Sequence, residues 1–397
     1  MKKIFIILSF MVTLLACSDG FLSPDNDDNK ENNVEQTEDN NGANENNETN
    51  ENFNVDIPTD LKGSGSINDP YIISSLGDLI RLKLNTNSGM RYNGEYFLQT
   101  SDIVCGKKLL NNDGLPNENE SEIEIFYECR NIGDPFMGIY DGGGNTIYGL
   151  TGPLFYEIHE GEIKNLTIKD SHIKGNANVL GAFVGSLYNG KISNCNNYAY
   201  VEMGQGIVGV CSENSVISKC TNYGFVFGGG LAREIKESTI EESANFGTVF
   251  SGGYNYVGGI VNLQYSNSII ESCFNAGNTE NTSEHYATHG GLVGVIFSNR
   301  CSIKSSINYG SCNTGASGGI CGLLKYYLDE STNNYWIETY SHKSSYEIDT
   351  RATTSTSVLS AKEMKKTEFI NMLNKNSGKA SLWKTGKSGF PVFSWHE

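Results

Sequence analysis

Basic residues are scarce in this chain, which has 29 lysines and arginines against 46 aspartates and glutamates. Its formal net charge is −17, and we expect no nucleic-acid partner, because phosphate binding needs clustered cations. Residues 18–56 hold twelve of the acidic residues and a single basic one. The net charge of that stretch is 1 − 12 = −11, so it holds most of the net negative charge of the chain.

Motifs for metal, phosphate or nucleophilic chemistry are also missing. A zinc peptidase needs His-Glu-x-x-His, but the segment that begins at His159 reads HEGEI and lacks the second histidine. His285 and His289 are four residues apart, yet the order is wrong and no third ligand is apparent, so we interpret them as loop histidines. The turn DGGGNT is not followed by a P-loop lysine. We therefore assign no catalytic residue, no metal and no cofactor.

The N-terminal apolar run is too short to cross a bilayer. It spans Ile4 to Leu15 after Lys2 and Lys3, which is typical of a secretory signal in residues 1–16. The run ends in LLAC at Cys17, and these letters resemble the bacterial lipobox. That resemblance implies cleavage before Cys17 and lipidation of its sulfur. The alternative is an ordinary signal peptide followed by a chance cysteine.

Residues 17–56 are interpreted as a disordered acidic tether. The stretch is rich in Asn and acidic residues and has little to bury, so it cannot offset the entropy cost of ordering. Acidic residues after a lipidated cysteine resemble the surface-export signal of Bacteroidetes lipoproteins. The resemblance implies a lipid-anchored, surface-exposed protein of the cell outer membrane. The chain has ten cysteines, and lipidation of Cys17 would leave an odd number, which does not indicate a disulfide framework.

An internal repeat dominates the remainder. A small residue before an aliphatic pair recurs every 24 to 32 residues, and the longer steps contain polar insertions. Fixed units with variable loops are typical of a repeat array. The recurring positions are Ala182, Gly206, Gly230, Gly259, Gly291 and Gly319.

Within each repeat the same columns return. Isoleucine is followed three residues later by Cys or Ser, two residues later by Asn, and two further on by Ala or Gly. The columns are Ile192, Ile217, Ile240, Ile270 and Ile303; Cys195, Cys220, Ser243, Cys273 and Ser306; Asn197, Asn222, Asn245, Asn275 and Asn308; and Ala199, Gly224, Gly247, Gly277 and Gly310. Alternation at the end of each unit predicts strands, with these columns facing inward.

A unit of this length with short strands and turns predicts one coil of a parallel β-solenoid. Stacked coils would place equal residues on each other at a spacing of about 4.8 Å. Buried Asn amides could then pair from coil to coil, which avoids a cost of a few kcal/mol for each unpaired group. We expect the glycines to supply turn angles with positive φ.

These repeats resemble a known family. The segments GGIV, GGLVG, CTNYG and CFNAG look like the GLUG repeat of bacterial surface proteins and of some IgA-cleaving peptidases. Upstream, GSGSINDPYIISSLGDLIRL and IGDPFMGIYDGGGNTIYGL resemble segments that precede such repeats, and LWKTGKSGFPVFSW resembles their closing strand. The resemblance covers roughly residues 63–397 and implies an all-β, right-handed parallel β-helix.

The expected organisation has three folded parts. Residues 57–150 form an N-terminal cap and first coils, residues 151–340 the repeats, and residues 341–397 a C-terminal cap. Helical apolar spacing over Ser74–Leu84, with Ser75 as N-cap, and over Ser360–Leu373 predicts a short helical cap at each end. Such caps would protect the open edges of the solenoid from aggregation.

One outward column is aromatic-rich. The residue between the inward Asn and the Gly is Tyr198, Tyr223, Phe246, Ala276 or Tyr309. Stacked aromatics on a rigid face could bind sugar rings or peptide, and the alternative is that they only stabilise neighbouring strands. Our ligand-binding candidates are Tyr198, Tyr223, Phe246 and Tyr309.

The favoured function is therefore binding or adhesion to a host or cell-surface glycan or protein. One alternative is a carbohydrate-active enzyme, either a lyase or a hydrolase, on the same scaffold. Its only carboxylate pair is Glu241 and Glu242, and we expect no second pair beside it on neighbouring repeats, while Asp134 and Asp141 lie in the segment that precedes the repeats. A further alternative is a structural envelope component.

Overall fold

The computed structural model describes residues 55–127, 135–175, 179–282, 287–311, 317–326, 328–337, 344–346 and 354–396. The chain divides into two units, and all described residues belong to the second, Thr49–Glu397. The predicted signal, the lipidation site Cys17 and nearly all of the predicted tether lie outside the described residues. Among the residues described, no helix is long and apolar enough to span a membrane.

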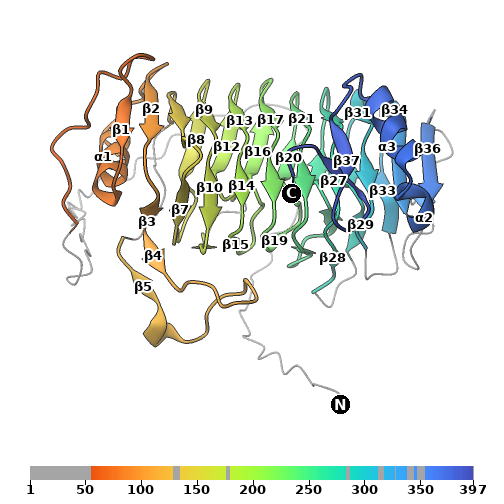
Figure 1. Ribbon diagram of the computed structural model, residues 1–397, viewed down its shortest axis with the longest axis horizontal. Coiled ribbons are helices and arrows are strands. Elements are labelled where there is room, and N and C mark those ends of the chain that lie inside the picture. Colours follow the sequence, from red (N-terminus) through yellow and green to blue (C-terminus); the bar gives the residue numbers. More distant parts are fainter. Residues whose placement is uncertain are drawn as a thin grey trace, which may run out of the picture. The chain divides into compact units, whose positions relative to one another are not determined.

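The described part of the chain is mostly β, with long parallel sheets and few helices (Figure 1). Each repeat contributes a strand to each of several parallel rows. The first row contains β8 (Phe155–His159), β12 (Val184–Tyr188), β16 (Val208–Ser212), β20 (Ala232–Ile235), β25 (Val261–Gln264), β30 (Val293–Ile296) and β33 (Ser317–Leu324). Beside this row, β24 (Tyr256–Gly258) pairs with β29 (Thr288–Gly290), and β29 and β35 (Ser344–Tyr346) each pair with β33.

The second and third rows follow the first along each repeat. The second row is β1 (Tyr71–Ile73), β2 (Tyr96–Gln99), β6 (Ile139–Asp141), β9 (Glu162–Lys164), β13 (Lys191–Ser193), β17 (Val216–Ser218), β21 (Thr239–Glu241), β26 (Ile269–Glu271), β31 (Cys301–Lys304), β34 (Leu328–Ile337) and β36 (Thr354–Leu359). The third row is β3 (Ile103–Val104), β7 (Thr146–Tyr148), β10 (Thr167–Lys169), β14 (Asn196–Asn197), β18 (Thr221–Asn222), β22 (Ala244–Asn245), β27 (Phe274–Asn275) and β32 (Ile307–Asn308), which ends on β34.

Short strands also pair where the repeats turn back. There β11 (His172–Ile173) pairs with β15 (Tyr200–Val201), and β23 (Val249–Phe250) pairs on its two sides with β19 (Val226–Phe227) and β28 (Thr279–Glu280). An insertion carries the antiparallel hairpin of β4 (Gly106–Lys107) and β5 (Glu124–Ile125), with the 3-10 helix Glu120–Glu122 between its strands.

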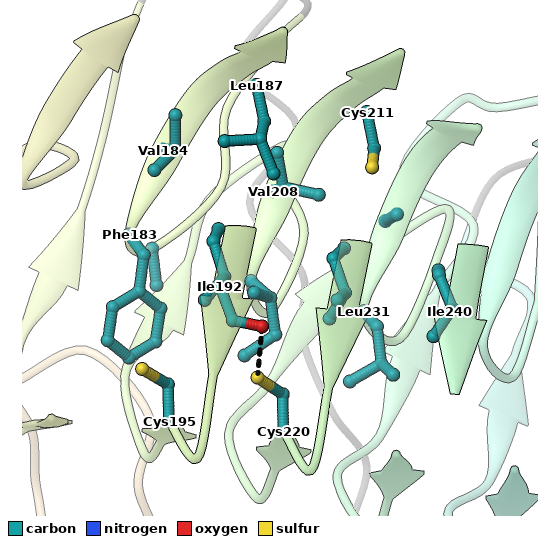
Figure 2. Close-up of a cluster of buried hydrophobic side chains, with 14 of the residues drawn as sticks. Phe183, Val184, Leu187, Ile192, Cys195, Val208, Cys211, Cys220, Leu231 and Ile240 are labelled. Carbon is teal, nitrogen blue, oxygen red and sulfur yellow. Dashed lines mark hydrogen bonds between the residues drawn. The ribbon is translucent and has the colours of Figure 1, made fainter. Parts of the chain in front are cut away.

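The register between strands is the register that the sequence columns predict. Ile217 pairs with Ile240 and Asn222 with Asn245, and the same matching continues to Ile303. All the Ile, Cys or Ser and Asn columns are buried. Figure 2 shows Cys195 and Cys220 at equivalent places, with the Cys220 thiol directed at the Ile192 carbonyl oxygen, 3.6 Å away. Cys195, Cys220 and Cys273 are free thiols, and burial raises the pKa of Cys273 to about 12.

The buried asparagines form a continuous ladder. The Nδ2 of each residue donates to the Oδ1 of the next one, at 2.8, 2.8, 2.9 and 3.0 Å, from Asn197 through Asn222, Asn245 and Asn275 to Asn308. Amides that would be costly to bury alone satisfy one another here. After Asn308 the register position is taken by Trp336, so the ladder ends against an indole ring.

The reason that glycine is required at the repeated positions differs from the one expected from the sequence. The glycine column from Gly224 to Gly310 does not have positive φ. A Cβ on Gly247 would instead lie 1.9 Å from the Gly224 carbonyl oxygen of the preceding repeat. A Cβ on Gly230 would lie 2.8 Å from the amide carbon of ladder residue Asn245. Close approach between repeats therefore excludes side chains, and the expectation of positive φ at these glycines is wrong.

Positive φ falls on other residues, at the bend between the second and third rows. Residues there are left-handed although none is glycine, because a short polar side chain or an outward-pointing stem can be accommodated. They are Asn165, Asn194, Lys219, Glu242, Ser272 and Ser305. Asn194 donates to Asn165, and Asn165 donates to Asp141, so part of this bend is a second, shorter amide stack.

The predicted N-terminal helix is present as α1 (Leu76–Asn87). Ser75 caps it, since its side chain accepts a hydrogen bond from the Asp78 amide. The helix lies beside β1 (Figure 1), and Leu79 and Leu82 bury their side chains in the same core cluster as Ile73 of β1. The helix therefore extends the core at the N-terminal end of the parallel rows.

The predicted C-terminal helix is divided into α2 (Ala361–Met364) and α3 (Thr367–Asn376). Ser360 and Glu363 form a capping box at the start of α2. The chain then makes the antiparallel hairpin of β37 (Trp383–Thr385) and β38 (Pro391–Phe393). We call residues 360–396 the C-terminal segment. Its apolar side chains share a core with Ala244, Phe274, Ile307 and Tyr335, so it packs along the outward side of the third row.

Candidate functional site

The predicted aromatic column lies on the outward side of the third row. Tyr198, Tyr223 and Phe246 each directly follow a ladder asparagine, so an inward amide fixes an outward ring. The backbone N–H of each aromatic residue donates to the preceding repeat, as in the 2.7 Å bond from Tyr223 to the Asn197 carbonyl. Backbone pairing thus sets both the direction and the spacing of the rings.

The rings of this column are stacked and nearly parallel. Tyr198 and Tyr223 stack with centroids 4.5 Å apart and an interplanar angle of 8°, and Tyr223 and Phe246 stack at 5.2 Å and 7°. Tyr198 is 40% exposed and Tyr223 is half-buried. We call Tyr198 and Tyr223 the tyrosine platform. The two rings stack face to face, so they present mainly their edges and hydroxyl groups outward, together with the face of Tyr198 that is turned away from Tyr223.

A lysine lies at one end of the tyrosine platform. Lys169 occupies the equivalent position in the preceding repeat, and its Nζ lies 5.8 Å from the centre of the Tyr198 ring. This side chain is exposed. A cation close to an aromatic surface allows the platform to meet either an apolar ring face or an anionic group.

The C-terminal segment meets the other end. Tyr309 donates a hydrogen bond of 3.1 Å to the Pro391 carbonyl and stacks on Phe390 at 4.8 Å. Phe246 packs edge-on against His396 at 5.3 Å. Phe246 and Tyr309 are half-buried against the C-terminal segment, Tyr223 is half-buried within the ring stack, and of the four candidate residues only Tyr198 is exposed.

Trp395 and His396 of the C-terminal segment lie beside the repeat that carries Tyr223. His396 and Thr221 share a hydrogen bond of 2.9 Å between Nε2 and Oγ1. Burial, together with the nearby Lys384, lowers the pKa of His396 to about 4, so the ring is neutral at neutral pH. Trp395 stacks on Phe393 and is 39% exposed, and Lys219 Nζ lies 5.5 Å from the centre of its ring. A third large aromatic surface therefore lies beside the repeat that carries Tyr223.

The sequence did not indicate Trp395 or His396. They lie far along the chain from Thr221 and outside the repeat, so no column contains them. The sequence does hold one indication of a covering segment, which is a change of polarity along one outward position of the third row. This position is polar in the earlier repeats and apolar in the later ones: Asn196, Thr221, Ala244, Phe274 and Ile307. An apolar outward face predicts a covering element.

The two carboxylates considered for glycan cleavage, Glu241 and Glu242, lie in different environments. Glu242 is buried at a left-handed bend and forms an ion pair with Lys379 of the C-terminal segment. Glu241 pairs in register with Glu271 of the next repeat. Glu271 is followed by Ser272, so the next repeat carries no second pair like Glu241 and Glu242, but the register that aligns Ile240 with Ile270 also aligns the single carboxylates of Glu241 and Glu271.

The histidines considered for metal binding do not meet in the described residues. His159 lies 3.5 Å from Glu157 and packs against Tyr188. His289 is buried in β29, and His285 lies outside the described residues. Within the ranges that the structure describes, no group of three or more His, Cys, Asp or Glu side chains could hold a metal ion.

Of the two aspartates that precede the repeats, Asp141 is described by the structure, and its contacts stabilise a turn. Asp141 accepts hydrogen bonds from the Gly143 amide and from Asn165, and pairs with Lys164 at 3.6 Å. These contacts hold the DGGGNT turn, in which Gly143 and Gly144 have φ of 60° and 81°. Asp134 lies outside the described residues.

Comparison with known proteins supports the fold alone. No protein-family model matches the chain. Halomucin of Haloquadratum walsbyi is 33% identical over 162 residues, which are 37% of this chain and only 2% of halomucin. A crystal structure from Bacteroides ovatus, described as a candidate immunoglobulin A1 protease, is 19% identical with a TM-score of 0.51. That alignment covers 84% of this chain and 95% of the other, and it shows a shared, mostly β fold with long parallel sheets.

Proposed function

We propose that this chain is a surface binding module built on a right-handed parallel β-helix of the GLUG type. In this proposal it is held at the outer membrane by lipid on Cys17 and displayed beyond the residue 17–56 tether. The register of successive repeats and the unbroken asparagine ladder support a β-helix. The lipobox-like LLAC motif supports the anchor. The match to halomucin is a weak further hint of a surface location.

The tyrosine platform is the observation that carries the binding function. Its two rings are parallel within 8°, partly exposed and fixed by backbone hydrogen bonds to the preceding repeat. Tyrosine offers a large apolar face and a polar hydroxyl while losing little conformational entropy on contact. A rigid surface of this kind needs no rearrangement to receive a ligand, which lowers the cost of binding.

The ligand class that fits is a glycan or a protein segment on a host or neighbouring cell surface. Sugar rings and extended peptides both present flat, partly apolar faces with polar edges. Exposed Lys169 and Trp395 extend the contact surface beyond the two tyrosines. A purely structural role is the outcome if no such ligand exists.

The test is an array of glycans and extracellular-matrix proteins probed with the full chain. We expect the double change Tyr198→Ala and Tyr223→Ala to abolish the positive signals while leaving the fold intact. Tyr156→Ala is the matched control, because Tyr156 is also 40% exposed but lies in β8 of the first row. Signals that survive the double change, or vanish equally in the control, would contradict the proposed site.

A carbohydrate-active enzyme is the second candidate, and the aligned Glu241 and Glu271 favour it. Carboxylates on neighbouring strands are a minimum for acid–base or nucleophilic cleavage of a glycosidic bond. The assay is release of reducing ends from acidic and neutral polysaccharides by the full chain. Activity that disappears in Glu271→Gln would support this candidate, whereas absence of any product would remove it.

A further inference from the structure

A second group of outward side chains gathers at the turns between the first and second rows. Glu237, Asn267 and Arg300 each occupy the left-handed region, with φ of 51°, 58° and 62°. They stand at equivalent turns, between β20 and β21, β25 and β26, and β30 and β31. Because those strands pair in register, the three turns lie next to one another and present their side chains at one edge.

These turns border a hollow of about 480 Å³. Two aromatic side chains complete its lining. Phe297 stacks on Tyr265 at 5.3 Å and 9°, which holds its ring in place, and Tyr326 is 51% exposed. The hollow therefore combines polar turn residues on one side with aromatic surface on the other.

The charges at the hollow are mixed but favour an anion. Arg300 lines it and is exposed, and Lys325 Nζ lies 4.3 Å from the centre of the Phe297 ring. Glu237 is the one carboxylate among the residues that line the hollow. A guanidinium binds a carboxylate through two parallel hydrogen bonds, while a carboxylate and an amide together suit neighbouring hydroxyl groups.

We propose that this hollow binds a saccharide that carries a carboxylate. The sugar carboxylate pairs with Arg300, ring hydroxyls donate to Glu237 and exchange hydrogen bonds with Asn267, and the sugar ring lies against Tyr326. An acidic peptide would supply the carboxylate but no ring with vicinal hydroxyls for Glu237 and Asn267. The site is separate from the tyrosine platform, which lies on the third row, and does not depend on it.

The experiment titrates the full chain with two matched pairs of probes, sialyllactose against lactose and trigalacturonate against galactotriose. We expect at least one acidic probe to bind about tenfold or more tightly than its neutral partner. If sialyllactose binds more tightly, the ligand is a sialate, and if trigalacturonate binds more tightly, it is a uronate. Arg300→Gln should weaken the acidic probe by about ten- to a hundredfold, because a charged hydrogen-bonded pair is lost. Glu237→Gln should retain binding of that probe.

The controls separate this site from the rest of the chain. Arg91→Gln removes another exposed arginine, at a distant loop, and should leave binding unchanged. Tyr198→Ala should also leave it unchanged, so failure of the tyrosine platform and failure of this site are distinguishable. Equal affinity for acidic and neutral probes, binding of an acidic peptide alone, or full affinity in Arg300→Gln with an unchanged melting temperature would overturn the proposal.

Discussion

Asn245 lies in the middle of the asparagine ladder. Its Nδ2 donates to Asn275 and to the Gly247 carbonyl, and its Oδ1 accepts from Asn222 and from the Gly247 amide. Every polar atom of this buried side chain is therefore used. The side chain connects three repeats, which makes it a sensitive probe of the inward assignment.

We expect Asn245→Ala to lower the free energy of unfolding by about 2–4 kcal/mol. The change leaves the Asn222 amide and the Asn275 oxygen short of one partner each, and a buried unpaired group costs roughly 1–3 kcal/mol. Tyr198→Ala, at an exposed outward position, should cost well below 1 kcal/mol. Denaturant unfolding of both variants gives the comparison. Similar unfolding midpoints for Asn245→Ala and the parent chain would show that the asparagine ladder does not stabilise the fold.

His396 gives the molecule a pH dependence. Its folded-state pKa is lowered to about 4 from 6.5, so between these values the unfolded chain takes up a proton that the folded chain does not. This contribution to stability is full above about pH 6.5 and is lost as the pH falls toward about 4. We expect the melting temperature to fall more between pH 7.5 and pH 5 in the parent than in His396→Gln. Parallel pH profiles would show that the ring is not buried against Thr221.

Single positions differ in how well the sequence predicted them. The inward asparagines and cysteines were predictable because equal residues at equal spacing must stack on themselves. The glycines were located correctly but explained wrongly, since spacing alone does not distinguish positive φ from contact with the next carbonyl. The alignment of Glu241 with Glu271 follows from that of Ile240 with Ile270, because equal spacing within the repeats fixes the register of both residues.

At the scale of strands, the register of the third row can be tested by cross-linking. Neighbouring parallel strands place equivalent Cα atoms about 4.8 Å apart, within the range of about 4.4–6.8 Å that a disulfide spans. Tyr198→Cys with Tyr223→Cys should therefore oxidise readily, whereas Tyr198→Cys with Phe246→Cys, two repeats apart, should not. The described native cysteines are buried and should not compete.

The measurement is peptide mass mapping after oxidation, alkylation and denaturation. Cys17→Ser, Cys129→Ser and Cys312→Ser in the background remove the cysteines whose placement the structure does not describe. If the distant pair joined as fast as the adjacent pair, the register of these strands would have to be revised.

Elements within the repeat were predictable, and the packing of the C-terminal segment was not. Both helix predictions were confirmed because capping and apolar spacing are local properties: Ser75 caps α1, and Ser360 caps α2. The course of the chain after α3 depends on contacts with distant residues, such as the ion pair of Lys379 with Glu242 and the contact of Phe393 with Phe274. No repeat or local pattern specifies such contacts, so the packing of this segment against Phe246 and Tyr309 could not be predicted.

For the whole molecule, the proposed anchor depends on Cys17, which lies outside the described residues. Cys17→Ser should release the protein from the membrane fraction and abolish labelling with a radioactive or alkynyl fatty acid, because the thioether carries the lipid. Fractionation of cells that express either form provides the measurement, with Cys129→Ser as the control. Equal membrane retention in Cys17→Ser would refute lipid anchoring.

The central claim is that the rows of stacked repeats hold inward asparagines so that Tyr198 and Tyr223 form an outward surface for a ligand. The most direct test is the dissociation constant of the full chain for the strongest array ligand, measured with Tyr223→Ala and with Tyr156→Ala. We predict a loss of about tenfold or more for Tyr223→Ala, as expected for a central aromatic contact, and less than twofold for Tyr156→Ala, with melting temperatures close to the parent in both. Equal affinities for the two variants would contradict the account.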